Sequence, residues 1–321
     1  DGAGAWGCGG AWGCRATAPR ARRRRSIQFI MLRAVLTGSG SGTRSSFLLI
    51  ARDLLYYGLA AAWHRLCGAL APPPPPCPPL PAAESLDGES LLSVVIPTFN
   101  EADTIDEVVR SALRDARVEV IIADGGSRDG TQEQARAAGA RVIDAPPGRA
   151  ACCNAGAAAA RGAFLLFIHG DTLLPQGFGA LLRSQLRSPG VAVAAFRLTL
   201  HPRLPALWLV EWATNRRSRR HGLPYGDQGL GMRRAVFEAL GRFPEQPFLE
   251  DLHLVLEARR RGPGAVVTMG ASVRSSSRRW EMHGVLGNSV RNQCVLLGYL
   301  CGVPLPRIAE WYYGTHGKKK Y

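Results

Sequence analysis

The sequence predicts an α/β fold built on a doubly wound, mostly parallel sheet. After residue 90, short apolar runs alternate with segments of helical periodicity. The runs are apolar throughout rather than at every second residue, as expected for strands buried on both faces of a parallel sheet. The chain has 321 residues, of which 46% are hydrophobic, so it can bury one large core, and disordered and fibrous classes are excluded.

Five runs are predicted as strands, and the segments between them as helices. The strands are residues 93–96, 118–123, 141–144, 163–168 and 191–196, and two clear helices are 105–114 and 132–138. In sheets of this kind, ligands bind beyond the carboxyl ends of the strands. The loops that follow the runs are therefore where functional residues are expected.

Residues 1–82 are predicted to be an N-terminal segment separate from a domain at 91–321. Residues 1–30 have low complexity, and Met31 is a candidate start; residues 31–52 carry basic and hydroxyl side chains and no acid, a composition typical of transit peptides. We expect a plastid or mitochondrial address, with a cytoplasmic location as the alternative.

Residues 46–70 predict an amphipathic helix, because only about ten uncharged residues occur in a row where a bilayer needs roughly twenty. The proline-rich stretch 72–81 is a stiff spacer.

The net charge of +15 suits anionic partners. Residues 1–90 hold ten arginines and five acids, which leaves thirty basic and twenty acidic residues for the domain. Nucleotide diphosphates and lipid headgroups fit this excess, and solvated basic faces are the alternative. Nucleic acid is not expected, because the basic residues are not interleaved with aromatics in a recognisable module. The cysteines form no CxxC pair, so no zinc site is predicted.

Two polar loops follow the first and second runs. The first run ends at Pro97, and Thr98, Asn100 and Glu101 form a polar lip before a helix. The second ends at Asp124 in the glycine-rich loop ADGGSRDGT. Such a loop lets the backbone approach a ligand while the acid accepts a hydrogen bond from a ribose or base. A tight turn that needs glycine is the alternative.

The fourth run ends in FIHGDT, with His169 and Asp171 one residue apart. Side chains at i and i+2 of an extended segment point the same way, so both can face one cation that bridges two phosphates. In the alternative, His169 only caps the strand end. Further along, a glycine-bounded turn contains Asp227 and Gln228, which suit the hydroxyls of a donor or acceptor.

These motifs together resemble a known family. The series SVVIPTFNE, ADGGSRDGT, GRAACCNAGAAAARG, FIHGDT and YGDQGLGMRRAVFEALGRFPEQPFLED is similar to the family 2 glycosyltransferases of the GT-A fold. It is most similar to the subgroup of selenodomain-associated transferases, and the likeness covers about residues 91 to 313. Five motifs in the same order are far more specific than any one of them.

The resemblance implies transfer of a sugar from a nucleoside-diphosphate sugar to an acceptor hydroxyl, with inversion. The lip from Pro97 to Glu101 and Asp124 would hold the nucleotide, and Arg149 and Asn154 would lie near the diphosphate. Asp171 would ligate Mn²⁺ or Mg²⁺. Asp251 would be the catalytic base, with Glu250 as the second candidate, and an acidic helix start is the alternative reading of both. The identity of the acceptor is not predicted.

One position departs from the family pattern. The family's metal motif has two aspartates around one residue, whereas His169 stands in the first place here. Imidazole ligates Mn²⁺ but matches Mg²⁺ less well. The substitution motivates an alternative, a catalytically silent nucleotide-sugar binding protein. A nucleotidyltransferase is disfavoured, because no glycine-rich loop with Arg and Lys follows the first strand.

The last third of the chain carries basic clusters at 216–220, 259–261 and 274–279, then an apolar helix predicted at 280–302. The uncharged run 292–306 is too short to span a bilayer. A core helix packed under the sheet is favoured. An interfacial helix that gives peripheral membrane contact is the alternative.

Overall fold

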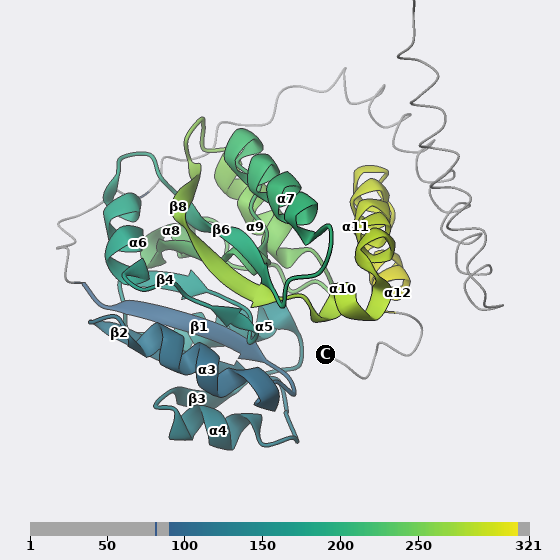
Figure 1. Ribbon diagram of the computed structural model, residues 1–321. Helices are drawn as coiled ribbons and strands as arrows, with labels where there is room; N and C mark the ends of the chain where they lie inside the picture. The colour runs from purple at the N-terminus through teal and green to yellow at the C-terminus, as the bar shows by residue number, and fades with distance from the viewer. Residues whose placement is uncertain (1–80, 82–89, 314–321) are drawn as a thin grey trace, which may run out of the picture. The chain divides into compact units, whose positions relative to one another are not determined.

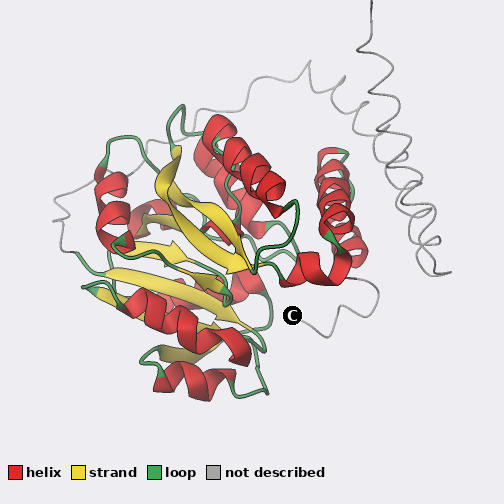
Figure 2. Ribbon diagram, viewed as in Figure 1, coloured by secondary structure: helices red, strands yellow, loops and turns green. Residues whose placement is uncertain are grey.

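The computed structural model describes residue 81 and residues 90–313 (Figures 1 and 2). The predictions for the transit segment, the amphipathic stretch and nearly all of the proline-rich spacer lie outside the described residues. The boundary between residues 1–82 and the domain therefore stays a prediction.

The described domain is built on one eight-stranded sheet with the order β3-β2-β1-β4-β7-β6-β8-β5. The strands are β1 (Leu92–Thr98), β2 (Val118–Asp124), β3 (Arg141–Asp144), β4 (Phe164–Phe167), β5 (Thr172–Leu173), β6 (Val193–His201), β7 (Leu230–Arg233) and β8 (Val266–Ser276). All five runs predicted as strands are strands. The prediction of an α/β fold of the GT-A type is confirmed.

Helices cover both faces of the sheet (Figure 2). They are α3 (Ala102–Leu113), α4 (Thr131–Ala137), α5 (Arg149–Ala159), α6 (Phe178–Arg187), α7 (Leu207–His221), α8 (Arg234–Ala239), α9 (Glu250–Arg259), α10 (Arg278–His283), α11 (Val285–Leu300) and α12 (Leu305–Tyr313), with a 3₁₀ turn, η1 (Gly226–Gln228).

Alternate residues of each central strand enter two separate cores. Val94 and Ile96 of β1 pack with α3, α4 and α6 on one face, and Val95 packs with α5, α8 and α9 on the other. All three side chains are fully buried. Burial on both faces explains why the strand segments are apolar at every position.

The sheet contains antiparallel strands that the sequence did not predict. Strands β3, β2, β1 and β4 run parallel, but β7 lies antiparallel between β4 and β6, and β5 is antiparallel to β8. The sequence LGMR of β7 is short and holds a glycine and an arginine, so no apolar run marks it. Because β7 is antiparallel, its first residue, Leu230, lies opposite Phe167 at the end of β4. The turn η1 is thereby brought to the carboxyl edge of the parallel strands.

The prediction of a core helix at 280–302 is wrong. Gly284, with φ of 70°, separates α10 from α11. Helix α11 packs against α12, and not under the sheet, through a small cluster that includes Val295 and Ile308. In the part of the chain that the structure describes, no helix is long and apolar enough to cross a membrane.

Candidate functional site

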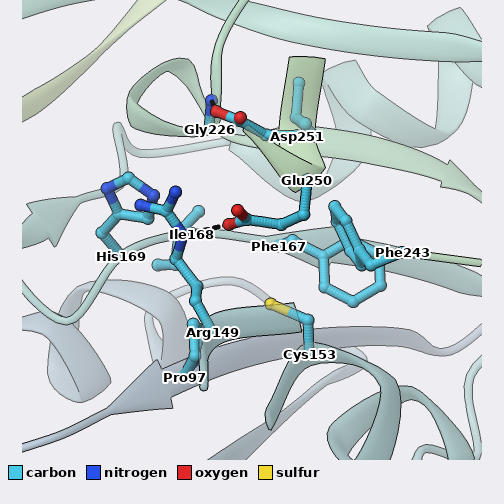
Figure 3. A pocket seen from close by; sticks show the side chains of 11 residues that line it. Pro97, Arg149, Cys153, Phe167, Ile168, His169, Gly226, Phe243, Glu250 and Asp251 are labelled. Carbon is cyan, nitrogen blue, oxygen red and sulfur yellow. Dashed lines mark hydrogen bonds and ion pairs between the residues drawn. The ribbon is translucent and has the colours of Figure 1, made fainter. Parts of the chain in front are cut away.

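The candidate site lies at the carboxyl edge of the sheet, where β1, β2 and β4 end. The parallel register sets Thr98 beside Asp124, the last residues of β1 and β2. A pocket opens next to them, and eleven residues line it (Figure 3). Five of these were predicted as site residues from the sequence, namely Pro97, Arg149, His169, Glu250 and Asp251.

An ion pair joins the starts of two helices in this pocket. Arg149 begins α5 and Glu250 begins α9, and Arg149 Nε donates to Glu250 Oε1 (Figure 3). The two side chains are 21% and 4% exposed. Burial lowers the pKa of Arg149, but the carboxylates of Glu250 and Asp251 raise it, and the net pKa is well above the ordinary value. The Glu250 carboxylate is thus held by a permanent cation.

Asp251 has neutral partners instead. Its Oδ2 accepts a hydrogen bond of 2.7 Å from the backbone N–H of Gly226, and its Oδ1 accepts one of 2.8 Å from the N–H of Leu252. A Cβ at position 226 would lie 2.9 Å from His169 Nε2 and 3.1 Å from Asp251 Oδ2. A larger residue at position 226 would therefore displace one of these two side chains. Of the two adjacent carboxylates, Asp251 is the one that forms no ion pair with residue 81 or residues 90–313.

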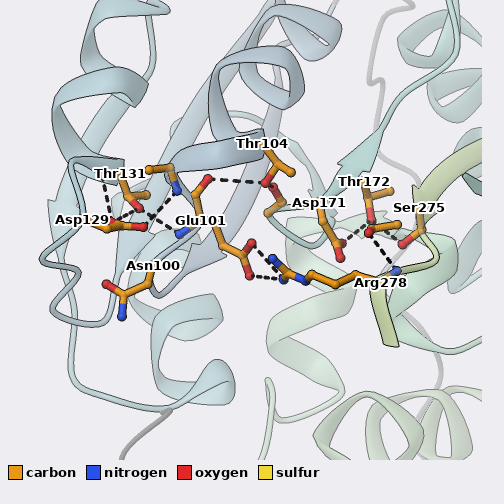
Figure 4. A network of polar contacts seen from close by, with 12 residues as sticks. Asn100, Glu101, Thr104, Asp129, Thr131, Asp171, Thr172, Ser275 and Arg278 are labelled. Carbon is orange, nitrogen blue, oxygen red and sulfur yellow. Dashed lines mark hydrogen bonds and ion pairs between the residues drawn. The ribbon is translucent and has the colours of Figure 1, made fainter. Parts of the chain in front are cut away.

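His169 and Asp171 lie in a turn and not in an extended strand. Strand β4 ends at Phe167, and the N–H of Thr172 donates to the carbonyl of His169 at 3.2 Å. The argument from strand alternation is therefore wrong. His169 faces the pocket, and Asp171 lies near the ion pair of Glu101 and Arg278 (Figures 3 and 4). Thr104 Oγ1 fixes the turn by donating to the carbonyl of Gly170 at 2.7 Å.

The imidazole of His169 is neutral at physiological pH. Burial first, and then the nearby charge of Arg149, lower its pKa to about 4, although Asp171 and Asp251 oppose the shift. A neutral imidazole keeps a lone pair that can ligate a metal or accept a hydrogen bond.

The polar lip and the glycine-rich loop form one network across the ends of β1 and β2 (Figure 4). The N–H of Asn100 donates to Ser127 Oγ at 2.8 Å, and the N–H of Arg128 donates back to Asn100 Oδ1 at 3.0 Å. The N–H of Glu101 donates to Thr131 Oγ1 at 2.9 Å. Asn100 has φ of 56°, a left-handed conformation that asparagine tolerates better than most residues.

Asp124 organises this loop from inside. Its oxygens accept from Thr98 Oγ1 at 2.9 Å, from the N–H and hydroxyl of Ser127 at 2.7 and 2.5 Å, from the N–H of Gly126 at 3.0 Å and from Gln132 Nε2 at 2.9 Å. Burial alone would raise the pKa of Asp124, but the hydrogen bonds of Ser127, Gln132 and Thr98 lower it, and they prevail. Protein donors thus surround the carboxylate, and its contact with a nucleotide stays a prediction.

Arg278 is a site residue that the sequence did not single out. Its Nη2 lies 3.3 and 3.4 Å from the two carboxylate oxygens of Glu101 (Figure 4). Burial raises the pKa of Glu101, Arg278 lowers it and Asp171 raises it, and the net shift is upward. The basic cluster 274–279 was the available signal. It could not be assigned, because β8, which ends beside the site, was not predicted.

Asn154 is occupied by the protein itself. Its Nδ2 donates to the carbonyl of Phe243 at 2.8 Å, and its Oδ1 accepts from the N–H of Phe243 at 3.1 Å. Both ends of the amide thus tie α5 to the loop before α9. A structural role accounts for this residue, and its predicted place near a diphosphate has no contact to support it.

Asp227 and Gln228 carry acceptor atoms without hydrogen bonds. Gln228 Nε2 donates to the carbonyl of Phe196 at 2.8 Å, but Gln228 Oε1 and Asp227 Oδ1 are buried without a partner among residues 81 and 90–313. Burial raises the pKa of Asp227, Arg217 lowers it, and Asp251 and Asp171 raise it further, to about 6. Buried acceptors without donors are rare in native proteins, so a polar ligand or water is expected here.

The described residues offer at most a partial set of ligands for a divalent ion. No group of three or more His, Cys, Asp or Glu side chains in the described residues is arranged to hold a metal. Asp171 and the neutral His169 are the predicted donors. Magnesium is commonly bound through one or two carboxylates together with substrate phosphates, so this donor set fits a site that a diphosphate completes.

Residues 93–240 match the model of glycosyl transferase family 2. This segment, which is less than half of the chain, is similar to the glycosyltransferase domains of that family. It contains the lip, the glycine-rich loop and the His169–Asp171 turn, while Glu250 and Asp251 lie beyond it.

Named relatives are similar over short segments. The glycosyltransferase AglJ of Haloferax volcanii is 44% identical over 50 residues, which are 16% of each chain. Glucosyl-3-phosphoglycerate synthase of Mycolicibacterium paratuberculosis is 38% identical over 96 residues, 26% of this chain and 29% of that protein. The chain thus spans less than a third of the length of these curated relatives.

Among solved structures, glucosyl-3-phosphoglycerate synthase from Mycobacterium tuberculosis, in complex with Mn²⁺, uridine diphosphate and glucosyl-3-phosphoglycerate, is 23% identical. The match covers 67% of this chain and 81% of that one, with a TM-score of 0.44. The likeness to selenodomain-associated transferases stays a prediction.

Proposed function

We propose that this protein transfers a sugar from a nucleoside-diphosphate sugar to an acceptor hydroxyl, with inversion and with Asp251 as the base. The observation that carries the proposal is that Asp251, from the start of α9, and His169, from the turn after β4, line one pocket, with Asp171 two residues further along that turn. Asp251 and His169 line one pocket, and Asp171 is close enough to both Glu101 and His169 to shift their pKa values.

The diphosphate would lie between the start of α5 and the metal donors. The first turn of α5 has no acidic residue, and the N-terminus of a helix attracts anions. Asp171 and His169 would hold Mn²⁺ or Mg²⁺, and a bound ion would neutralise charge on the departing diphosphate. Arg149 adds positive charge, although Glu250 already engages it.

Asp251 would accept the proton of the acceptor hydroxyl while that oxygen attacks the anomeric carbon. Its hydrogen bonds from Gly226 and Leu252 fix the carboxylate, and they leave lone pairs for the acceptor. The buried acceptor atoms of Asp227 and Gln228 suit the hydroxyl donors of a sugar.

Asp251→Asn tests the base. The amide keeps the shape but cannot take the proton, so we expect donor binding to persist while transfer falls by about two to four orders of magnitude. Glu257→Gln, in the same helix but outside the pocket, is the matched control and should retain full activity. Slow hydrolysis of a panel of sugar nucleotides, with and without acceptor extracts, is the assay.

The alternative is a catalytically silent nucleotide-sugar binding protein. It would replace the enzyme if wild type and Asp251→Asn hydrolysed every donor at the same low rate and no extract accelerated the wild type. The same sugar nucleotides would then raise the melting temperature of the protein without being hydrolysed faster in its presence.

Asp171→Ala tests the metal donors. Calorimetry of uridine and guanosine diphosphate binding, with and without Mn²⁺, should show metal-dependent affinity that the variant lowers at least about tenfold. Glu133→Ala, an exposed charge on α4, is the control. Unchanged affinity of Asp171→Ala in Mn²⁺ would remove Asp171 from the metal site.

A further inference from the structure

We propose that an exposed apolar face of this domain docks on the surface of an anionic lipid bilayer. The docking face consists of Trp208, Leu209 and Trp212 of α7, Met282 of α10 and Leu286 of α11. Trp208 and Trp212 are 63% and 55% exposed, and Met282 is 63% exposed. Large side chains gathered in this way are unusual on a monomer surface, where exposed apolar residues are normally scattered.

The residues of the docking face come from helices whose first turns meet. Leu207 and Val210 of α7 pack on the same small cluster as Trp280 of α10 and Val285 of α11. Trp208 and Leu209 follow Leu207, and Leu286 follows Val285. The exposed side chains are therefore next in sequence to residues that pack in one cluster. Leu297 and Leu300 extend the apolar surface along α11, at 51% and 58% exposure.

Basic side chains continue the exposed face of α7. Trp208, Trp212 and Arg216 are spaced four residues apart and therefore share one side of the helix. The guanidinium carbon of Arg216 lies 5.3 Å from the centre of the Trp212 ring. Arg219 and Arg220 follow, and both are exposed. They lie with His221 in the last turn of α7, and these three basic residues are its only titratable side chains.

The two carboxylates near this surface, Glu211 and Glu281, already accept hydrogen bonds from the protein. Glu211 of α7 accepts a hydrogen bond from the N–H of Leu200 at 2.8 Å and lies 3.8 Å from Arg203. Glu281 of α10 accepts from Ser277 Oγ at 2.9 Å. The exposed arginines thus face solvent with little opposing charge, on a chain with net charge +15.

Tryptophan and leucine beside arginine are the side chains that enter and flank the headgroup region of a membrane. The charge of the surface favours a bilayer with anionic lipid over an uncharged partner or a second copy of this chain. None of the docking-face residues lines the pocket, so docking does not depend on the proposed sugar transfer.

Flotation of the full-length chain with lipid vesicles tests the proposal. We expect binding to phosphatidylcholine vesicles that contain about 30 mol% phosphatidylglycerol, and little binding to phosphatidylcholine alone. The double variant Trp208→Ser, Trp212→Ser should lower the partition coefficient at least tenfold. Leu181→Ser on α6, which changes an exposed leucine outside the docking face, is the matched control and should leave it unchanged.

The triple variant Arg216→Gln, Arg219→Gln, Arg220→Gln separates charge from apolar contact. It should weaken binding and flatten the dependence on salt. Both variants must melt as the wild type does. Unchanged vesicle binding of both would overturn the proposal. Loss of self-association in sedimentation, with vesicle binding unchanged, would also overturn it and assign the face to a second copy.

Discussion

Glu250 and Asp251 are neighbours in the chain, yet their surroundings differ. Glu250 is almost fully buried and pairs with Arg149, whereas Asp251 is half-buried and accepts from backbone N–H groups. A buried ion pair is costly to break from one side, because the remaining charge stays in a poorly solvated place. The side chain at 250 thus holds two helices together, and the one at 251 is available to a substrate.

The first prediction at this scale concerns that ion pair. Glu250→Gln leaves Arg149 buried without a carboxylate, so the free energy of unfolding should fall by about 3–5 kcal/mol in urea denaturation. Asp106→Asn removes an exposed pair with Arg110, whose side chain is 61% exposed, and should change little. Equal effects of the two variants would contradict the difference in burial.

The second prediction concerns pH. In the folded protein the raised pKa of Asp227 keeps its carboxyl protonated up to pH about 6, whereas the unfolded chain releases the proton near the ordinary pKa of 3.8. Between these values the folded state binds more protons, so this group lowers stability as the pH rises. Asp227→Asn should therefore stabilise the protein above pH 6, by at most on the order of 3 kcal/mol.

The measurement is urea denaturation of both proteins from pH 4 to 8, and the quantity of interest is their difference in unfolding free energy. This difference should grow between pH 4 and 6 and then level off. A difference that does not vary with pH would show that Asp227 ionises normally in the folded protein.

Helix α5 packs closely against the sheet. Gly156 faces β1, and a Cβ there would overlap Val95 Cγ1. The close contact lets the first turn of α5 reach the carboxyl edge, where Arg149 meets Glu250. The sequence could indicate the central strands, because they are buried on both faces and carry continuous apolar runs. It could not indicate β7 and β8, whose half-buried or short segments lack such runs.

Gly156→Ala tests this packing. The added methyl group must displace α5 or Val95, so we expect a loss of about 1–3 kcal/mol in unfolding free energy. Gly287→Ala is the matched control, because a Cβ added at this helical glycine of α11 would meet no atom within 4 Å. It should stabilise the protein by about 0.5–1 kcal/mol. If both glycines tolerate alanine equally, the contact of α5 with β1 is looser than described.

For the whole molecule, one contact concerns the residues next to the predicted domain boundary. Arg233 Nη1 of β7 donates to the carbonyl of Pro81 at 3.0 Å, so the end of the proline-rich stretch touches the sheet. A chain that begins at Pro81 should melt cooperatively at the temperature of the full chain. One that begins at Ser90 loses the contact and should melt slightly lower. Aggregation of the chain that begins at Pro81 would mean that residues 1–80 contribute to the core.

We also propose that residues 1–82 direct the protein to plastids or mitochondria. It rests on the composition of residues 31–52, which lie outside the described residues. A fluorescent protein fused behind residues 1–82 should enter plastids or mitochondria in cells. A cytoplasmic distribution would contradict the proposal.

The sequence by itself determined the α/β class, five of the strands and the loops at which a ligand is expected, because these depend on local apolar patterns and local turn residues. It also singled out Asp251, His169 and Asp171 through a resemblance of ordered motifs. Only the tertiary structure decided which of these side chains meet. The antiparallel entry of β7 brings Gly226 between His169 and Asp251, and β8 brings Arg278 to Glu101. Such contacts depend on pairings between strands far apart in the chain, which no local pattern records.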